Sequence, residues 1–433
     1  MNNAHLNIGF LIPPFVGHLR PATVLARALA RRGHRVQIIS YPDAMAPLAK
    51  AGVELTTFGE SMFPPGEWDR RVGSLGAAEG REIYLQVFRL ILDQCRCLAT
   101  DLPATLKRLK LDGLVVDQLC YGAESVAESL GVPMVVACNA LPFHRESGVP
   151  QCFRPWNYNP ALWARLRNKA EGAWNILTGW RMSVFYLKHR RALGLRPPAL
   201  SHINEIPPSL AQVAQIPKFF DFPRRRLPDH FHYTGPWLEP ARTEADDFPW
   251  ARLNGRPLIY ASLGTLQNRV MRWYGIIAAA CEGLDVQLVI GLGRISEDVG
   301  ALLPELPQRT IVAHFAPQRE LISRAALVIT HAGLNSTLET LSAGVPIVAV
   351  PISHDQPGVA ARLRHLGAGK VISAAELTVD RLRPAIAEVM QTSSFGLRAR
   401  ECARSLHEIN GQELAADVIE RAFQTGQRTV RWK

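Results

Sequence analysis

Short apolar runs alternate with amphipathic segments along most of the chain, and this alternation predicts an α/β protein. The apolar run at 6–12 predicts a strand, and the segment after it predicts a helix that has Pro21 in its first turn and ends before Gly33. The apolar run at 35–40 predicts a second strand. Because strands joined by a crossover helix pair in parallel with a right-handed connection, we expect a parallel sheet.

The alternation continues through the first half of the chain and restarts after an interruption. Helices are predicted at 81–109 and 122–130, and strands at 113–116 and 133–137. A segment rich in proline and charge, at 235–257, interrupts the pattern. The strands predicted after it are 258–262, 287–290, 310–313, 327–330 and 346–350. We therefore expect two Rossmann-like domains that face each other across a cleft, with ligands outside the carboxyl ends of their strands.

The length of the chain agrees with this organisation, because 433 residues predict two domains at roughly 100–200 residues each. We expect an N-terminal domain over 1–238, a linker over 239–256 and a C-terminal domain over 257–410. Residues 411–433 are expected to form a helix that packs back on the N-terminal domain.

Composition excludes several classes of protein. With 47% apolar residues, 20% charged residues and a mean hydropathy of zero, the chain is globular. No uncharged apolar stretch reaches the roughly 20 residues that a membrane-spanning helix needs. The N-terminal segment lacks the basic region and the cleavage site of a signal peptide. The seven scattered cysteines are expected to be reduced thiols, so we expect a cytoplasmic protein.

The net charge of +11 indicates an anionic partner, and most of the excess lies in residues 151–191. This segment has one acidic residue, Glu171, against eight basic residues: Arg154, Arg165, Arg167, Lys169, Arg181, Lys188, Arg190 and Arg191. It also contains four tryptophans, Trp156, Trp163, Trp174 and Trp180. Two interpretations stay open: a basic surface helix that packs its tryptophans into the core, or a helix at an anionic membrane surface. We expect no nucleic-acid partner, because no nucleic-acid-binding fold accompanies the charge.

A polar turn directly follows one of the predicted C-terminal strands. His331 and Gly333 form this turn, and a helix is expected to begin near Asn335. Helix N-termini present free N–H groups and a partial positive charge, so the turn suits a diphosphate. Ser336 and Glu339 also fit a capping box, which would need no ligand. From the residues alone, both interpretations stay open.

Three further segments lie at the ends of predicted strands: SLGT at 262–265, HFAPQ at 314–318 and PISHDQP at 351–357. The run from HFAPQ through THAGLNSTLETLSAGVPIVAVPISHDQP resembles the donor-binding signature of family 1, UDP-dependent, glycosyltransferases of the GT-B fold. The resemblance spans nearly the whole chain. It implies two facing Rossmann-like domains, of which the N-terminal one binds the acceptor and the C-terminal one binds the nucleotide-sugar donor.

The resemblance also implies a role for each matching residue of the donor site. The residues implied to contact the diphosphate are Ser262, Thr265 and His331, with the backbone N–H groups of Gly333, Asn335 and Ser336. Those implied to hold the uridine are Glu339 on the ribose hydroxyls, Gln318 beside the nucleoside, and Phe315 stacked on uracil, where the family often has Trp. Asp355 and Gln356 match the pair that hydrogen-bonds the sugar hydroxyls, and Gln at the second position usually accompanies glucose.

The implied catalytic pair lies in the other domain. His18 is expected in the loop after the first strand, where it matches the general base of the family. An isolated His in such a loop is more often an incidental surface residue, but an imidazole is suited to take a proton from a hydroxyl. Asp117 matches the carboxylate that orients this base, although it would also fit a cap of the following helix. With one base and no second nucleophile, we expect a single displacement that inverts the sugar configuration, giving a β-glycoside.

The chain contains no Asp-x-Asp pair and no carboxylate–histidine cluster at metal-ligand spacing. We therefore expect no cofactor and activity without a divalent ion, with UDP-glucose as the donor. The helix N-terminus and His331 would then stabilise the leaving UDP.

Two segments, at 216–237 and 353–363, are similar to bacterial carotenoid (zeaxanthin-type) glucosyltransferases. This similarity implies an apolar hydroxylated acceptor dissolved in a membrane, and it agrees with the basic, Trp-rich segment at 151–191. We expect a cytoplasmic enzyme that is peripheral at the inner face of the plasma membrane. A soluble phenolic, flavonoid or macrolide acceptor is the alternative.

Other classes of protein fit less well. A non-catalytic sugar-nucleotide or lipid-binding protein would keep the donor signature without needing His18. An epimerase that acts on the nucleotide sugar itself would not need a base that serves an acceptor. A nicotinamide dehydrogenase is suggested by the first βαβ unit and Asp43, but the turn PPFVGH lacks the Gly-x-Gly-x-x-Gly fingerprint.

Overall fold

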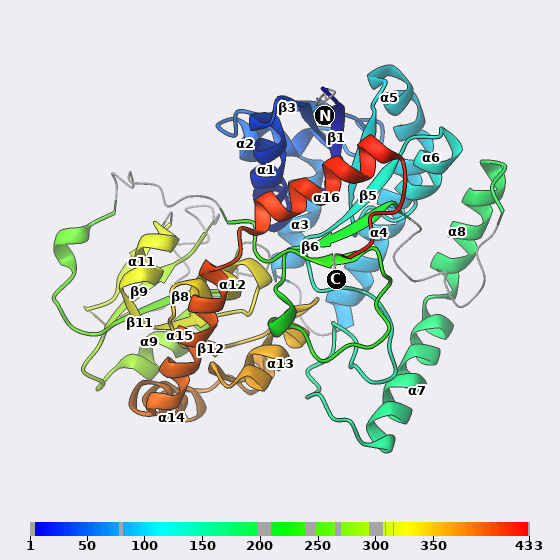
Figure 1. Cartoon of the computed structure of the whole chain (residues 1–433). Coiled ribbons are helices and arrows are strands. Elements are labelled where there is room, and N and C mark those ends of the chain that lie inside the picture. The colour runs from blue at the N-terminus through cyan, green and yellow to red at the C-terminus, as the bar shows by residue number, and fades with distance from the viewer. Residues whose placement is uncertain are drawn as a thin grey trace.

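Two parallel β-sheets form the framework of the protein (Figure 1). The computed structural model describes residues 5–77, 81–196, 209–238, 248–264, 270–293, 306–307, 309–314 and 316–431. Within these residues the N-terminal sheet has seven strands in the order β3-β2-β1-β4-β5-β6-β7, and the C-terminal sheet has six in the order β10-β9-β8-β11-β12-β13. Every pairing is parallel. This is the arrangement of two Rossmann-like domains that the sequence predicted.

The strands of the N-terminal sheet are β1 (Asn7–Leu11), β2 (Arg35–Ser40), β3 (Glu54–Thr57), β4 (Gly113–Asp117), β5 (Met134–Cys138), β6 (Ala211–Ala214) and β7 (Phe231–Tyr233). Those of the C-terminal sheet are β8 (Leu258–Ser262), β9 (Gln287–Gly291), β10 (Ile311–Ala313), β11 (Ala325–Thr330), β12 (Ile347–Ala349) and β13 (Gly369–Val371). Four of these strands, β3, β6, β7 and β13, have no counterpart in the sequence prediction. They are three or four residues long, which is too short for a clear apolar period.

The helices of the N-terminal domain are α1 (Val16–Arg31), α2 (Met45–Leu48), α3 (Glu67–Ala77), α4 (Arg81–Thr100), α5 (Leu102–Leu109), α6 (Ala123–Ser129), α7 (Leu162–Thr178), α8 (Trp180–Ala192) and the C-terminal α16 (Gly411–Thr425). Those of the C-terminal domain are α9 (Met271–Cys281), α11 (Gln318–Arg324), α12 (Leu334–Ser342), α13 (Gln356–Leu366), α14 (Val379–Gln391) and α15 (Ser393–His407).

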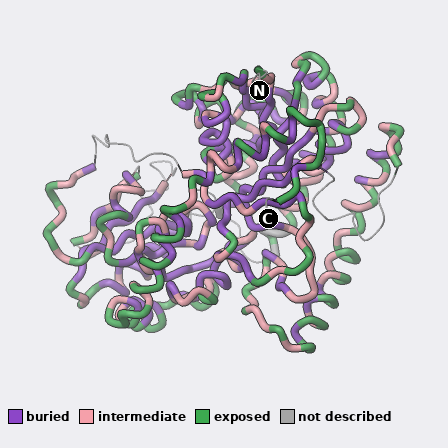
Figure 2. The backbone as a smooth tube through the Cα atoms, in the orientation of Figure 1, coloured by how far each residue is buried: buried purple, intermediate pink, exposed green. Residues whose placement is uncertain are grey.

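Alternate residues of each strand face opposite layers of helices. In β4, Leu114 and Val116 pack into the core beneath α4, α5 and α6, whereas Val115 packs into the core formed with α1 and α16. In β8, Ile259 packs toward α9 and α14, and Tyr260 packs toward α11. In Figure 2 the backbone in the sheets of both domains is coloured mostly as buried. Both faces of each sheet are therefore covered, as expected for parallel sheets.

The C-terminal helix α16 lies against α1, next to the N-terminal sheet (Figure 1). Arg32, which follows α1, pairs with Glu413 at 2.6 Å and with Asp417 at 2.7 Å. The ring of Phe423 covers Gly113 so closely that a Cβ atom there would lie about 2.5 Å from it. The chain thus crosses from one domain to the other twice. The predicted domain boundaries at 238 and 257 stay predictions, because residues 239–247 lie outside the described residues.

The predicted start of the first helix was wrong. The helix α1 begins at Val16, so His18 lies in its first turn rather than in a loop, and Pro21 lies in its second turn. A proline inside a helix leaves the carbonyl four residues earlier without its helical donor. Here that carbonyl belongs to Gly17, and it accepts a hydrogen bond from Asn335 of the other domain instead.

The seven cysteines are all buried and free. Among the helices that the structure describes, none combines the length and apolarity that crossing a membrane requires.

Candidate active site

The side chains of His18 and Asp117 meet where the carboxyl end of β4 faces the start of α1. Nδ1 of His18 lies 2.7 Å from Oδ2 of Asp117. The Asp117 side chain has no solvent exposure, whereas 15% of the His18 side chain stays exposed. The carboxylate therefore fixes the orientation of the ring and leaves Nε2 as the nitrogen that can accept a proton.

Three donors hold the carboxylate of Asp117. Besides His18, the side-chain N–H of Asn139 donates to Oδ2 at 2.6 Å, and the backbone N–H of Leu119 donates to Oδ1 at 2.8 Å. The next helix, α6, has Gly122 at its N-cap. The alternative in which Asp117 caps that helix is therefore wrong.

The charge state of His18 follows from this environment. Burial lowers the pKa of His18, but the carboxylate of Asp117, and to a smaller extent that of Asp355, raises it, and the net pKa lies above 6.5. A base with such a pKa is strong enough to take a proton in the neutral range. Asp355 reaches His18 from the other domain, so the two halves of the protein meet at this ring.

Further contacts join the two domains beside His18. Asn335, in the first turn of α12, donates its side-chain N–H to the backbone carbonyl of Gly17 at 2.7 Å. Its side-chain oxygen accepts an N–H from Gln215 at 2.9 Å, and Gln215 also donates to the carbonyl of Asn139. A continuous chain of hydrogen bonds therefore runs from the start of α12 to the residue that holds Asp117.

The turn before α12 is built closely around the ring of His331. A Cβ atom at Gly264 would lie 2.5 Å from Cε1 of this ring, and one at Gly333 would overlap it. Only glycine fits at these two positions. Burial and, to a smaller extent, the nearby His354 lower the pKa of His331, a hydrogen bond to the backbone of Ser262 opposes the shift, and the resulting pKa is about 4. The ring is therefore neutral at physiological pH, with its single N–H engaged by the backbone of Ser262.

The helix α12 begins at Leu334 with Gly333 as its N-cap, and no side chain caps it. Ser336 is already the third residue of the helix, so the capping-box interpretation of Ser336 and Glu339 is wrong. Their side chains instead meet Gln318, whose amide donates to Glu339 and lies 3.5 Å from the hydroxyl of Ser336. Gln318 and Glu339, both expected around the uridine, are thus brought together with Ser336, which is expected at the diphosphate.

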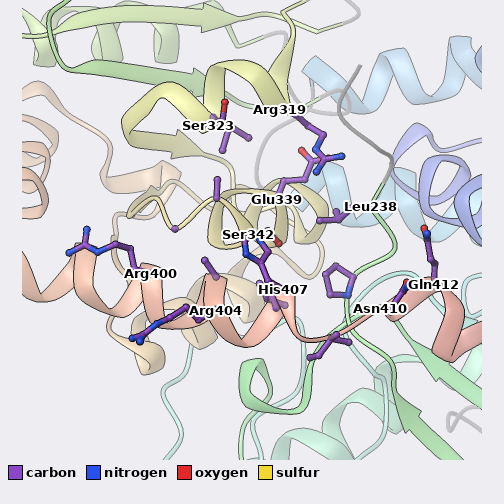
Figure 3. Close-up of a pocket in the computed structure, with 18 of the residues that line it drawn as sticks. Leu238, Arg319, Ser323, Glu339, Ser342, Arg400, Arg404, His407, Asn410 and Gln412 are labelled. Atoms are coloured by element: carbon purple, nitrogen blue, oxygen red, sulfur yellow. The ribbon is translucent and has the colours of Figure 1, made fainter. Parts of the chain in front are cut away.

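A cavity of about 800 Å³ opens beside Glu339, between α11, α12 and α15 (Figure 3). Arg319 lines it on the α11 side, and Arg404 and His407 line it from α15. Glu339 therefore borders open space at the edge of the expected donor site.

The loop before α13 carries the residues expected to contact the sugar. The carboxylate of Asp355 accepts the backbone N–H of Leu141, across the domain boundary, at 3.4 Å. Burial raises the pKa of Asp355. The side-chain carbonyl of Gln356 accepts the N–H groups of Ile352 and Ser353, at 2.9 and 3.0 Å, so this oxygen shapes the loop. What Gln356 can offer a sugar is its amide N–H group.

Comparison with known proteins decides the family. The family model described as UDP-glucoronosyl and UDP-glucosyl transferase matches residues 75–408. The chain belongs to this family of glycosyltransferases. The glycosyltransferase is 32% identical over 421 residues to a zeaxanthin glucosyltransferase of Pantoea ananas, covering 96% of each chain. It is also 32% identical over 428 residues to a zeaxanthin glucosyltransferase of Pseudescherichia vulneris, covering 96% of this chain and 98% of that relative.

Solved structures agree with this assignment at the level of the fold. A kitacinnamycin glycosyltransferase has a TM-score of 0.71 at 24% identity, covering 96% of this chain and 98% of its own. A calicheamicin glycosyltransferase has a TM-score of 0.71 at 22% identity, covering 98% and 99%. The protein is thus an enzyme of the GT-B fold that transfers a sugar from a nucleotide sugar.

Two expected donor-site residues of the glycosyltransferase, Thr265 and Phe315, lie outside the described residues. Ser262 ends β8, and its hydroxyl is 3.4 Å from the N–H of Gly264. Within the described part of the chain, no group of three His, Cys, Asp or Glu side chains is placed to hold a metal ion.

Sequence reasoning missed three polar residues of the glycosyltransferase site. Asn139 follows the predicted strand at 133–137, so the rule that ligands bind after strands would have found it. Gln215 follows β6, which was not predicted. His354 has a left-handed backbone with φ of 57°, and its ring is close enough to His18 and Asp355 to interact electrostatically with both.

Proposed function

We propose that the enzyme transfers glucose from UDP-glucose to a hydroxyl of an apolar acceptor, a carotenoid or terpenoid alcohol such as zeaxanthin, with inversion at the sugar carbon. The observation that carries the mechanism is the 2.7 Å contact between His18 Nδ1 and the buried carboxylate of Asp117. A ring held in this way presents Nε2 to the cleft as a general base.

In this reaction the acceptor oxygen forms a bond to the anomeric carbon while the bond from that carbon to the β-phosphate oxygen breaks. The hydroxyl proton passes to Nε2 of His18, and Asp117 stabilises the resulting imidazolium. Attack from the side opposite the leaving UDP converts an α-linked donor into a β-glycoside. A second nucleophile is not required for this single displacement.

The leaving UDP acquires negative charge as the bond breaks. The first N–H groups of α12, at Asn335 and Ser336, and the ring of His331 are proposed to stabilise this charge. Gln318 and Glu339 are proposed to hold the ribose, Phe315 the uracil, Ser262 and Thr265 the phosphates, and Asp355 and Gln356 the glucose. The reaction is proposed to need no cofactor and no divalent ion.

The proposed acceptor class is supported by the 32% identity to two zeaxanthin glucosyltransferases over 96% of the chain. It is also supported by the segments at 216–237 and 353–363, which meet in the structure through Asp221 and Arg362. We propose that the enzyme works in the cytoplasm, which its seven free cysteines favour, at the inner face of the plasma membrane.

Mass spectrometry of the products tests this proposal. The protein is incubated with UDP-glucose and zeaxanthin in detergent micelles, with EDTA present, and a product heavier by one or two hexoses is expected. The variant His18→Ala should form no product yet still be stabilised against heating by UDP. Product formed by His18→Ala at the wild-type rate would overturn the assigned base. Transfer to a soluble phenol, flavonoid or macrolide but not to zeaxanthin would overturn the acceptor class alone.

A further inference from the structure

Exposed apolar side chains are concentrated in one part of the N-terminal domain. Of the thirteen large hydrophobic residues exposed among the described residues, nine lie between 153 and 184. They are Phe153, Leu162, Trp163, Leu166, Trp174, Ile176, Leu177, Trp180 and Val184. Soluble proteins rarely leave so many large apolar residues together on one surface. The interpretation in which the tryptophans of this segment pack into the core is therefore wrong for Trp163, Trp174 and Trp180.

The helix α7 turns an apolar stripe outward. Along one side, Ala164, Asn168 and Glu171 are buried at a spacing of four and three residues. The residues exposed along the other side are Trp163, Leu166, Ala170, Trp174 and Leu177, at a spacing of three or four. This spacing places them on one face of the helix. The polarity of α7 is thus the reverse of that of an ordinary surface helix.

Polar contacts on the inner side fix α7 in this orientation. The side chain of Asn168 donates to the backbone carbonyl of Ser147 at 3.0 Å, and Glu171 is paired with Arg154. Rotating the helix to bury its tryptophans would expose these partners and leave Glu171 without its cation. The outward apolar face is therefore determined by the fold.

The next helix, α8, is anchored separately and continues the same projecting arm (Figure 1). Arg190 pairs with Glu128 of α6 at 2.8 Å and lies 3.3 Å from Ser125. Trp180 and Val184, near Gly179 where α7 passes into α8, stay exposed. The α7–α8 arm, residues 162–192, is thus attached through its inner sides and exposes apolar side chains on both helices.

Cations surround this apolar surface. The exposed basic residues of the α7–α8 arm are Arg165, Lys169, Arg181, Lys188 and Arg191. Residues 151–191 are all described, and their single acidic residue, Glu171, is buried and paired. The guanidinium of Arg167 lies 4.0 Å from the ring centroid of Trp156 and 5.4 Å from that of Trp163. Residues 151–191 therefore offer apolar rings and positive charge, and no exposed negative charge of their own.

We propose that the outer face of the α7–α8 arm docks on an anionic lipid bilayer, with Trp163, Leu166 and Trp174 among the acyl chains and the flanking cations at the lipid phosphates. Tryptophan favours the membrane interface, and each cation near an anionic surface adds to the attraction. Docking would give the enzyme access to an acceptor dissolved in the bilayer, and this purpose rests on the proposed function. The docking itself requires neither donor nor acceptor.

Binding of the full chain to vesicles tests the proposal. Vesicles of phosphatidylcholine and phosphatidylglycerol in equal parts should sediment the wild-type protein, and vesicles of phosphatidylcholine alone should sediment much less. The double variant Arg165→Gln/Lys169→Gln should bind about thirtyfold more weakly, because each cation near the surface contributes about fivefold. The variant Trp163→Ser/Trp174→Ser should lose binding at any salt concentration. The matched control Met45→Ser, which removes another exposed apolar residue, should bind like the wild type.

Two outcomes would overturn the docking proposal. One is equal sedimentation of the wild type, the arginine–lysine variant and the tryptophan variant. The other is a wild-type dimer in solution that the tryptophan variant converts to a monomer, which would assign this face to a second copy of the chain. Glucosyl transfer to an acceptor dissolved in detergent is measured on the same variants. If a variant loses vesicle binding but keeps this transfer, docking has failed while the proposed function has not. Retained transfer also shows that the variants fold.

Discussion

Asn335 of the C-terminal domain donates its side-chain N–H to the backbone carbonyl of Gly17 in the N-terminal domain, at 2.7 Å. In an uninterrupted helix this carbonyl would accept the N–H of the residue four positions later. That residue is Pro21, which has no N–H. The proline thus leaves the carbonyl available to the other domain, one residue from His18.

We expect Asn335→Ala to lower kcat/KM for glucosyl transfer about tenfold, because one or two hydrogen bonds beside the base are lost. Steady-state kinetics with UDP-glucose measures this, and circular dichroism checks that the variant is folded. The companion variant Pro21→Ala restores an N–H to the helix, which competes for the Gly17 carbonyl, so a smaller loss is expected. Wild-type kinetics for Asn335→Ala would show that the contact does not contribute to transfer.

The pH dependence of transfer should report the pair formed by His18 and Asp117. His18 acts as a base only when neutral, so activity should fall as pH decreases through its pKa, which lies above 6.5. Asp117→Asn removes the carboxylate that raises this pKa, so the acidic limb of the profile should move to lower pH. The maximal rate should also fall, by about 10²–10⁴-fold.

A second histidine–carboxylate pair of the same domain provides the control for that experiment. His34 lies 2.6 Å from Glu420, between β2 and α16 and away from the cleft. The variant His34→Gln should leave the position of the acidic limb unchanged. An acidic limb that stays in place for Asp117→Asn would contradict the assignment of His18 as the titrating base.

The free energy of unfolding should depend on pH because His331 is neutral in the folded protein. Its pKa is about 4 in the folded state, against an ordinary value of 6.5. Between these values the unfolded chain binds a proton that the folded protein does not, so His331 makes stability fall as pH decreases from about 6.5 to about 4. The variant His331→Gln should flatten this part of the curve, measured by urea unfolding at several pH values. A slope equal to that of the wild type would contradict the neutral assignment.

The same variant should affect transfer in a different way. Gln retains an N–H donor but lacks the ring that fits between Gly264 and Gly333, so we expect kcat to fall less for His331→Gln than for His331→Ala. Removal of one donor to a developing anion costs about 10²–10³-fold in other enzymes. Equal rates for His331→Ala and the wild type would show that the ring does not stabilise the leaving group.

The alternation of strands and helices and the turn at His331–Gly333 were predictable because they depend on local patterns. An apolar run that ends in such a turn indicates a parallel strand and its ligand edge at once. The helix after the first strand was predicted, but its start was placed after His18, because Pro21 is a helix-start signal when only local preferences are considered. What made the proline tolerable was Asn335, more than 300 residues later, and no local pattern contains such a contact.

The short strand β6 was missed for a related reason, and Gln215 was missed with it. Four residues, Ala211–Ala214, carry little apolar periodicity, and they form a strand because β5 and β7 lie on either side. The sequence did not show whether the tryptophans of α7 point into the core or into solvent. Their spacing places them on one face of a helix but does not say which way that face points. Asn168 and Glu171, which determine that direction, have partners outside the helix.

A buried ion pair holds α13 against the N-terminal domain. Nη2 of Arg362 lies 2.7 Å from Oδ1 of Asp221, and neither side chain is exposed to solvent. Arg224 and the hydroxyl of Tyr233 complete the shell of the carboxylate, at 2.6 and 2.9 Å. Because Asp355 and Gln356 stand at the start of α13, the pair also positions the loop proposed to bind glucose.

We expect Arg362→Met to lower the free energy of unfolding by about 3–5 kcal/mol, because it removes one of the two buried cations that pair with Asp221. The control is Lys370→Met, which breaks the exposed pair with Glu388 and should cost about 0–1 kcal/mol. Urea unfolding measures both changes. In Arg362→Met, KM for UDP-glucose should rise more than kcat falls, since α13 is displaced while His18 and Asp117 are not. If Arg362→Met lowered the free energy of unfolding no more than Lys370→Met does, Arg224 alone would be sufficient to pair with Asp221. The apolar contacts of α13 would then hold it in place.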